Sequence, residues 1–195
     1  MAVQHPPRPA SLPTPGDQEG AAEPSGALRA LAVLRIVTGA IFLWAFLDKA
    51  LGLGYATASE RSWLQGGSPA QGYLSGVSVG PLESTFHSWA GQVAVDWLYM
   101  AGMGGLGVSL VLGIGLRVTA VAGPLMMLML WVSEFPPARY HSDGSPTMSP
   151  NPLIDSHVIY AGVMVVVALY SAGRVYGLGA WWERTQLVRN LPWLR

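Results

Sequence analysis

The sequence predicts an all-α integral membrane protein, a four-helix bundle with an extended outer loop between its first and second helices. Hydrophobic residues make up 51% of the 195-residue chain and charged residues only 11%, about half the charged fraction of a soluble domain. Four apolar stretches each approach the roughly 20 residues that cross a hydrocarbon core. The formal net charge is zero and the basic residues are scattered, so a nucleic-acid partner is not expected.

The N-terminal region divides into a tail and a first span. Residues 1–27 are rich in Pro, Ala, Gly and Ser without a periodic apolar pattern, which predicts a disordered cytoplasmic tail. The apolar stretch at 28–47 ends in FLDKA and lacks the small residue that precedes a signal-peptide cleavage point. We therefore expect an uncleaved first transmembrane helix.

Three further spans are predicted at residues 97–116, 118–135 and 153–172. Only Arg117 separates the second from the third, which predicts two antiparallel neighbouring helices. Four spans also put both termini on one side of the membrane. That side carries seven arginines: Arg8, Arg29, Arg117, Arg174, Arg184, Arg189 and Arg195. The other side carries Lys49, Arg61 and Arg139, so the positive-inside bias predicts a multi-pass protein of the cytoplasmic (inner) membrane with both termini cytoplasmic.

Small and flexible residues mark the second and third spans. Ala101, Gly105, Ser109 and Gly113 recur every four residues, a pattern that predicts close approach of another helix backbone. The third span contains PLMMLML at 124–130, whose methionines either fill a core or line an apolar pocket.

The remaining segments are predicted to lie at the two membrane surfaces. The loop at 52–92 is too long for a simple connection and is expected to cap the outer ends of the helices in the bundle domain, residues 28–175. Residues 176–195 mix tryptophans with arginines, which is typical of a segment at the cytoplasmic lipid interface.

Ionisable residues gather at the predicted outer ends of the spans. Asp48 ends the first span, Asp96 begins the second, Glu134 ends the third, and Asp155 and His157 begin the fourth. An ionisable side chain inside a membrane usually pairs, because an unpaired charge in hydrocarbon is costly. We therefore expect any chemical site near the outer leaflet; the alternative is that the acids only mark the water boundary.

The start of the fourth span allows two interpretations. Asn151 is predicted as the helix N-cap and Pro152 as its first residue, so Asp155 could simply favour the positive end of the helix dipole. Residues two apart point about 200° around a helix, so Asp155 and His157 are not expected to face one another. Imidazole is the side chain best suited to exchange protons at physiological pH, so His157 is either functional or a hydrogen-bonded structural histidine. Arg35 in the first span is expected to snorkel to the cytoplasmic interface.

Six segments resemble the DoxX-like membrane proteins, particularly the branch of the DoxD-type large subunit of thiosulfate:quinone oxidoreductase. They are LRIVTGA at 34–40, FLDK at 46–49, GGSPAQGYL at 66–74, VDWLY at 95–99, NPLIDSH at 151–157 and AGRVYGL at 172–178. The resemblance implies a four-helix membrane protein, partnered with other subunits in some members. It also implies electron transfer from a small reduced sulfur compound, such as thiosulfate, to a membrane quinone (menaquinone or ubiquinone).

A quinone site needs an apolar slot and titratable groups near the carbonyl oxygens. We assign that role to His157, with Asp155 or Glu134 as proton carrier and Trp131 against the ring. A small anionic substrate would use the outward-facing side chains, a set that comprises Lys49, Arg61 and Arg139 together with the polar layer of Asp48 and Asp96.

Cysteine is absent, and two intramembrane histidines for a haem are also lacking, so we expect neither a metal nor a covalent haem. Electrons would pass through a second subunit or by direct contact between substrate and quinone. The alternative function is a non-catalytic membrane subunit or scaffold that docks a soluble redox or detoxifying enzyme at the lipid bilayer.

Overall fold

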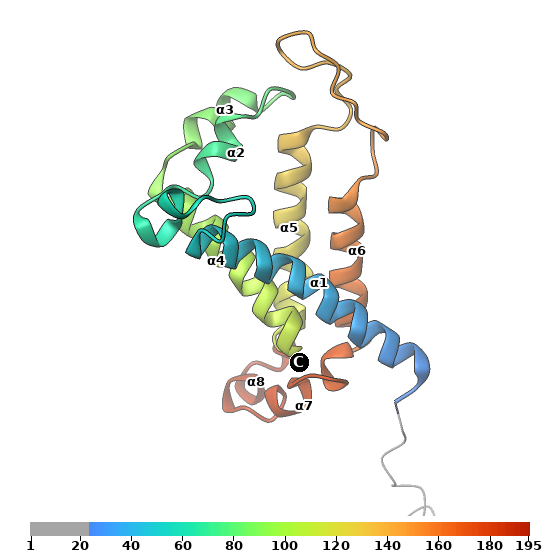
Figure 1. Cartoon of the computed structure of the whole chain (residues 1–195). Helices are drawn as coiled ribbons and strands as arrows, with labels where there is room; N and C mark the ends of the chain where they lie inside the picture. The colour runs from blue at the N-terminus through green and yellow to red at the C-terminus, as the bar shows by residue number, and fades with distance from the viewer. Residues whose placement is uncertain (1–23) are drawn as a thin grey trace, which may run out of the picture.

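A computed structural model describes residues 24–195 of the chain. Within this range the protein contains eight α-helices, short 3₁₀ turns and no β-strand (Figure 1). Residues 1–23 of the predicted disordered tail lie outside the described residues. The predicted all-α class is therefore confirmed for the part that the structure describes.

Three helices are long and apolar enough to cross a membrane: α1 (Gly26–Leu51), α4 (Val93–Leu112) and α5 (Leu116–Glu134). Their 26, 20 and 19 residues correspond to about 39, 30 and 28 Å at 1.5 Å per residue. The fourth apolar helix, α6 (Ser156–Leu169), has 14 residues and is about 21 Å long. Three helices that could cross a membrane thus occur near the first three predicted spans, whereas the fourth predicted span corresponds to a helix shorter than the roughly 20 residues of a full crossing.

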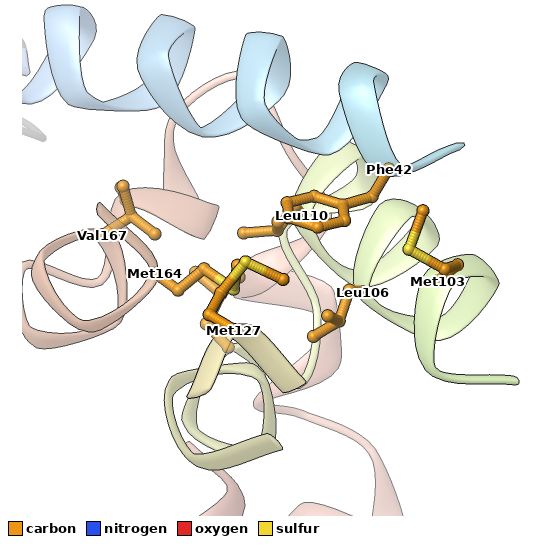
Figure 2. Close-up of a cluster of buried hydrophobic side chains, with 9 residues drawn as sticks. Phe42, Met103, Leu106, Leu110, Met127, Met164 and Val167 are labelled. Carbon is orange, nitrogen blue, oxygen red and sulfur yellow. The ribbon is translucent and has the colours of Figure 1, made fainter. Parts of the chain in front are cut away.

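The four apolar helices pack as two pairs around one core. α1 lies mainly against α4 and α5 mainly against α6, whereas α4 and α5 share fewer contacts. Figure 2 shows the core, to which each of the four helices contributes: Phe42, Met103, Leu106, Leu110, Met127, Met164 and Val167. Van der Waals packing of such side chains is a main source of helix association in lipid, since lipid tails are as apolar as leucine.

The close contact between α1 and α4 depends on glycines that the four-residue stripe does not include. A Cβ added at Gly39 would lie 2.7 Å from the Leu110 Cβ, and one at Gly107 would lie 2.6 Å from the Leu43 backbone nitrogen. These positions let the two backbones approach each other.

The predicted role of the small-residue stripe is therefore wrong for most of its length. A Cβ at Gly105 would meet nothing within 4 Å. Ala101, Gly105 and Ser109 instead line a cavity between α4 and α5. The four-residue spacing correctly places these residues on one helical face, but it does not determine what lies opposite that face.

The connection between α4 and α5 differs from the predicted break at Arg117. α4 ends at Leu112, and Gly113 and Gly115 follow with φ angles of 72° and 60°. Glycine adopts this left-handed conformation without the clash that a Cβ would cause. Arg117 is already in the first turn of α5, so the reversal occurs at the two glycines.

Both described ends of the chain lie at the same end of the helices as this turn, here called the terminal end (Figure 1). The opposite end, here called the loop end, carries the loop between α1 and α4 and the loop between α5 and α6. The first loop folds into α2 (Gln71–Ser75), α3 (Glu83–Trp89) and two 3₁₀ turns. One cluster of its buried side chains comprises Ala70, Leu74, Val77 and Phe86, which pack with Val95 and Tyr99 of α4 and Val132 of α5. The loop therefore covers the ends of α4 and α5, as predicted.

Arg35 is fully buried, so the prediction that it snorkels to the interface is wrong. Its Nη1 donates to the carbonyls of Leu110 and Val111 at the end of α4, and its Nη2 donates to those of Val175 and Tyr176. The last carbonyls of a helix lack intrahelical partners and carry the negative end of the dipole. The guanidinium therefore joins α1 to the end of α4 and to the C-terminal segment.

The C-terminal segment folds into α7 (Gly179–Trp182), α8 (Gln186–Asn190) and a last 3₁₀ turn. Arg174 and Glu183 form a two-point ion pair at 2.8 and 2.6 Å. The Trp182 indole donates to the Leu194 carbonyl at 3.0 Å, while Trp181 and Trp193 are exposed. The segment thus combines a folded interior with outward-facing indoles.

Replacing Arg35 tests its role as a connector. We expect Arg35→Lys to lower the free energy of unfolding by about 1–3 kcal/mol, because one ammonium cannot serve both carbonyl pairs. Arg35→Met should cost more, since it leaves all four carbonyls without this donor. The midpoint of unfolding in mixed detergent–SDS micelles, followed by tryptophan fluorescence, measures both. Arg117→Lys at an exposed position of the same end is the control, and an equal loss there would contradict the assignment.

Two helical glycines of α4 provide a matched pair. Gly107→Ala should destabilise the protein by about 1–3 kcal/mol, because its Cβ would collide with the α1 backbone. Gly105→Ala should be neutral or stabilise by up to about 1 kcal/mol, because the helix gains propensity and no neighbour is displaced. The same unfolding assay applies. Equal destabilisation by the two substitutions would show that α1 does not contact α4 in this register.

Candidate functional site

The loop ends of α5 and α6 bring three predicted site residues together: Glu134, Asp155 and His157. Each presents a potential ligand atom, and these atoms all lie within 4.8 Å of one another. Glu134 is exposed at the end of α5, whereas the Asp155 and His157 side chains are only 19% and 13% exposed. The sequence placed these three groups in one layer, and the structure places them in one cluster.

Local turn chemistry determines where α6 begins. The Asn151 side chain accepts hydrogen bonds from the backbone of Leu153 at 2.9 Å and of Ile154 at 3.0 Å. This is a turn before the helix, so the prediction that Asn151 is the N-cap is wrong. Asp155 is the N-cap: its Oδ1 accepts from the backbone of His157 at 3.0 Å and of Val158 at 3.3 Å. A side-chain acceptor at this position satisfies amides that have no partner within the helix.

Asp155 and His157 also contact each other directly. The second carboxylate oxygen of Asp155 lies 2.8 Å from His157 Nδ1. The expectation that they cannot face one another assumed that both residues were helical. Asp155 has extended backbone angles (φ −127°, ψ −169°), so the rotation of 100° per residue does not apply to it. An ionised carboxylate can only accept a hydrogen bond, so Nδ1–H donates to it, and this favours the tautomer in which Nε2 has the lone pair.

An apolar groove of about 330 Å³ adjoins the dyad between α5 and α6. Trp131 and His157 line it together with five apolar residues: Pro124, Met127, Leu128, Val158 and Ala161. The Trp131 indole donates to the Leu153 carbonyl at 3.1 Å, which fixes the ring beside the start of α6. The predicted neighbours Trp131 and His157 thus share one surface.

Two predicted site residues serve the first loop instead. Asp48 is buried, and its carboxylate accepts from the backbone of Tyr55 at 3.2 Å and of Ala56 at 3.0 Å. Asp96 is buried and accepts from the Ser68 hydroxyl at 2.6 Å and the Ala70 backbone at 2.9 Å. The hydrogen bonds of both carboxylates therefore anchor the loop that covers the helix ends.

The three predicted cations do not line the groove. Lys49 lies in the last turn of α1, and Arg61 ends a 3₁₀ turn of the first loop. Arg139 lies in the second loop, where its carbonyl accepts from the Thr147 backbone at 3.0 Å. Arg61 and Arg139 are exposed, so an anion could reach them from solvent, but they do not form one binding site with His157.

The sequence did not single out a polar pair at the top of the α4–α5 cavity. The Tyr73 hydroxyl lies 2.6 Å from the Ser133 hydroxyl, and both residues line that cavity. Tyr73 is in a glycine-rich loop segment, 60 residues from Ser133, and no spacing rule relates the two. The small-residue stripe was the available signal for the cavity beneath them.

The cluster can carry out two kinds of chemistry. Glu134, Asp155 and His157 can hold and pass protons, and their ligand atoms are close enough to share a cation. The structure therefore brings possible metal ligands together where the sequence predicted no metal. The apolar groove beside them suits a lipophilic molecule more than a hydrated ion.

No family model, curated protein or solved structure matches this chain. The resemblance to the DoxX-like family accordingly stays a prediction from its quoted segments.

Capping and histidine pairing by Asp155 can be separated. Asp155→Ala should lower the free energy of unfolding by about 0.5–2 kcal/mol, the usual value of an N-cap. Asp155→Asn keeps a side-chain oxygen for the backbone amides. It should therefore lower the free energy of unfolding by only about a few tenths of a kcal/mol. Unfolding in mixed micelles measures both, and a stable Asp155→Ala variant would contradict the cap assignment.

Proposed function

We propose that this chain is a quinone-linked redox subunit of a membrane, with its reaction site at the loop ends of α5 and α6. The observation that carries the proposal is the position of the Asp155–His157 dyad at an apolar groove that Trp131 also lines. A quinone ring needs an apolar wall and a proton donor within hydrogen-bond reach of its carbonyl oxygen.

The dyad supplies that proton donor. Reduction of a quinone to a quinol takes up two electrons and two protons. His157, protonated at both ring nitrogens, would donate a proton from Nε2 while the Asp155 carboxylate accepts from Nδ1–H and stabilises the imidazolium. Glu134, the exposed member of the cluster, would reprotonate Nε2 from solvent, and the restored imidazolium would supply the second proton. Trp131 would lie against the ring.

The electrons are proposed to come from a small reduced sulfur compound such as thiosulfate. Two thiosulfate ions would lose one electron each and join through a new S–S bond, and the two electrons would reduce one quinone. The exposed cations Arg61 and Arg139 lie on the two loops and would attract such an anion to this end. The electrons would pass from the substrate to the quinone either through a second subunit or by direct contact between the two molecules.

The proposal includes an arrangement in the membrane. α6 with its flanking residues would complete a four-helix bundle, although α6 alone is shorter than the roughly 20 residues of a full span. The terminal end, with its arginines, would face the cytoplasm, and the loop end would face outward.

The test compares two histidines at the loop end. The full chain is purified, its bound quinone is extracted, and thiosulfate-dependent quinone reduction is assayed. We expect His157→Gln to reduce the rate about 100-fold or more, because general acid–base groups contribute on the order of 10²–10⁴. His87→Gln, whose imidazole lies 2.7 Å from a loop carbonyl, is the control and should keep its activity.

Two results would count against the proposal. Full activity of His157→Gln would remove the dyad from the reaction. Activity that appears only with an added partner enzyme, and that His157→Gln does not change, would favour the alternative function of a non-catalytic scaffold.

A further inference from the structure

A second hollow lies on the other side of α5, and the proposed redox site does not use it. The cavity between α4 and α5 measures about 670 Å³, twice the volume of the groove beside His157 and within the range of ligand pockets. α4 contributes small residues, including Ala101 and Gly105, and α5 contributes Met126 and Met129. The methionines were predicted either to fill a core or to line a pocket, and these two line the pocket.

The dimensions of the cavity limit what it can hold. Its lining on α5 runs from Val118 to Ser133, a rise of about 22 Å at 1.5 Å per residue. The cavity is therefore long relative to its volume of about 670 Å³, which is the volume of a pocket for one drug-sized ligand. A single hydrocarbon chain with a small head group matches this elongated space.

The loop end of the cavity favours a lipid over a transmembrane helix of another protein. The first loop covers that end, where Phe86 and Trp89 line the cavity. A chain that ends beneath this roof fits, whereas a helix that continues across the membrane would collide with it.

The polar groups of the cavity indicate the head of the ligand. The Tyr73 and Ser133 hydroxyls, 2.6 Å apart, lie at the closed end, and together they can donate and accept hydrogen bonds. Burial raises the pKa of Tyr73, and the carboxylates of Glu134 and Asp155 raise it further, against the opposing effect of the Ser133 hydrogen bond. The same carboxylates would repel an anionic head.

The side of the cavity is open to the surroundings of the helices. Leu98 of α4 and Leu125 of α5 line it while they are 76% and 59% exposed. In a bilayer these side chains face lipid tails, so a lipid can enter laterally.

We propose that the α4–α5 cavity binds one single-chain lipid whose uncharged hydroxyl or carbonyl head hydrogen-bonds to Tyr73 and Ser133. This site is separate from the redox site proposed above and does not depend on it. The lipid fills the space between two helices that share fewer contacts than the helices within each pair.

The test is a titration followed by native mass spectrometry of the full chain in detergent, at pH 8, with three probes that differ in one property each. They are 1-palmitoylglycerol (one chain, uncharged), dipalmitoylglycerol (two chains, uncharged) and palmitate (one chain, anionic). We expect a complex of the protein with 1-palmitoylglycerol, and no complex with dipalmitoylglycerol or palmitate. A decyl-tailed benzoquinone is then added as competitor. If it displaces 1-palmitoylglycerol, the site accepts a carbonyl head; if it does not, the site requires a hydroxyl head.

Two variants locate the site. Gly105→Leu fills the cavity and should weaken binding about tenfold or more, while the added helix propensity keeps the fold. Tyr73→Phe removes one head contact and should weaken binding about threefold to tenfold. Gly162→Leu on α6 is the matched control, because its Cβ also meets nothing within 4 Å and the residue does not line the cavity.

Unchanged binding in Gly105→Leu, or equally tight binding of dipalmitoylglycerol, would overturn the proposal. The His157→Gln variant should bind 1-palmitoylglycerol like the wild type. Failure of the lipid site and failure of the redox proposal are therefore distinguishable.

Discussion

The contact of Arg35 with four backbone carbonyls is the constraint on which the rest of the structure depends. A buried charge is costly unless it is paired, and here carbonyls take the place of a carboxylate. The bonded groups belong to the end of α4 and to residues 175–176, and the surrounding glycines permit the approach: a Cβ at Gly177 would lie 2.9 Å from Arg35 Nη2. Three segments that are distant in sequence are thereby held together at the terminal end.

Because the helices are joined at this end, they can separate toward the other one. The glycine turn and Arg35 hold the helix pairs together at the terminal end, while α4 and α5 share fewer contacts than the helices within each pair. The space left by this divergence lies beneath the first loop. Asp48 and Asp96 hold that loop in place by accepting hydrogen bonds from its backbone amides. These two aspartates, which were predicted as site residues, thus help to keep the loop over the cavity.

Much of the fold was predictable, because membrane-crossing helices require long apolar segments and the chain contains few charges. The sequence predictions were wrong where one side chain had several possible hydrogen-bond partners. Arg35 resembled a snorkelling side chain because the carbonyls that it binds are 75 to 141 residues away. Depth alone predicts that Glu134, Asp155 and His157 share one layer, but not that they converge on one cluster or that Asp155 contacts His157. That contact depends on a helix that begins at Ser156, four residues after the expected proline.

The two loops at the loop end are hydrogen-bonded to each other at Ser78. Ser78 of the first loop accepts the Ser142 amide through its carbonyl at 2.8 Å, and its hydroxyl lies 2.8 Å from His141 Nδ1. The first loop roofs the α4–α5 cavity, and the second leads into the start of α6 beside Trp131. A displacement of either loop must therefore strain or break these bonds, so the cover of the α4–α5 cavity and the segment that leads to His157 cannot move independently.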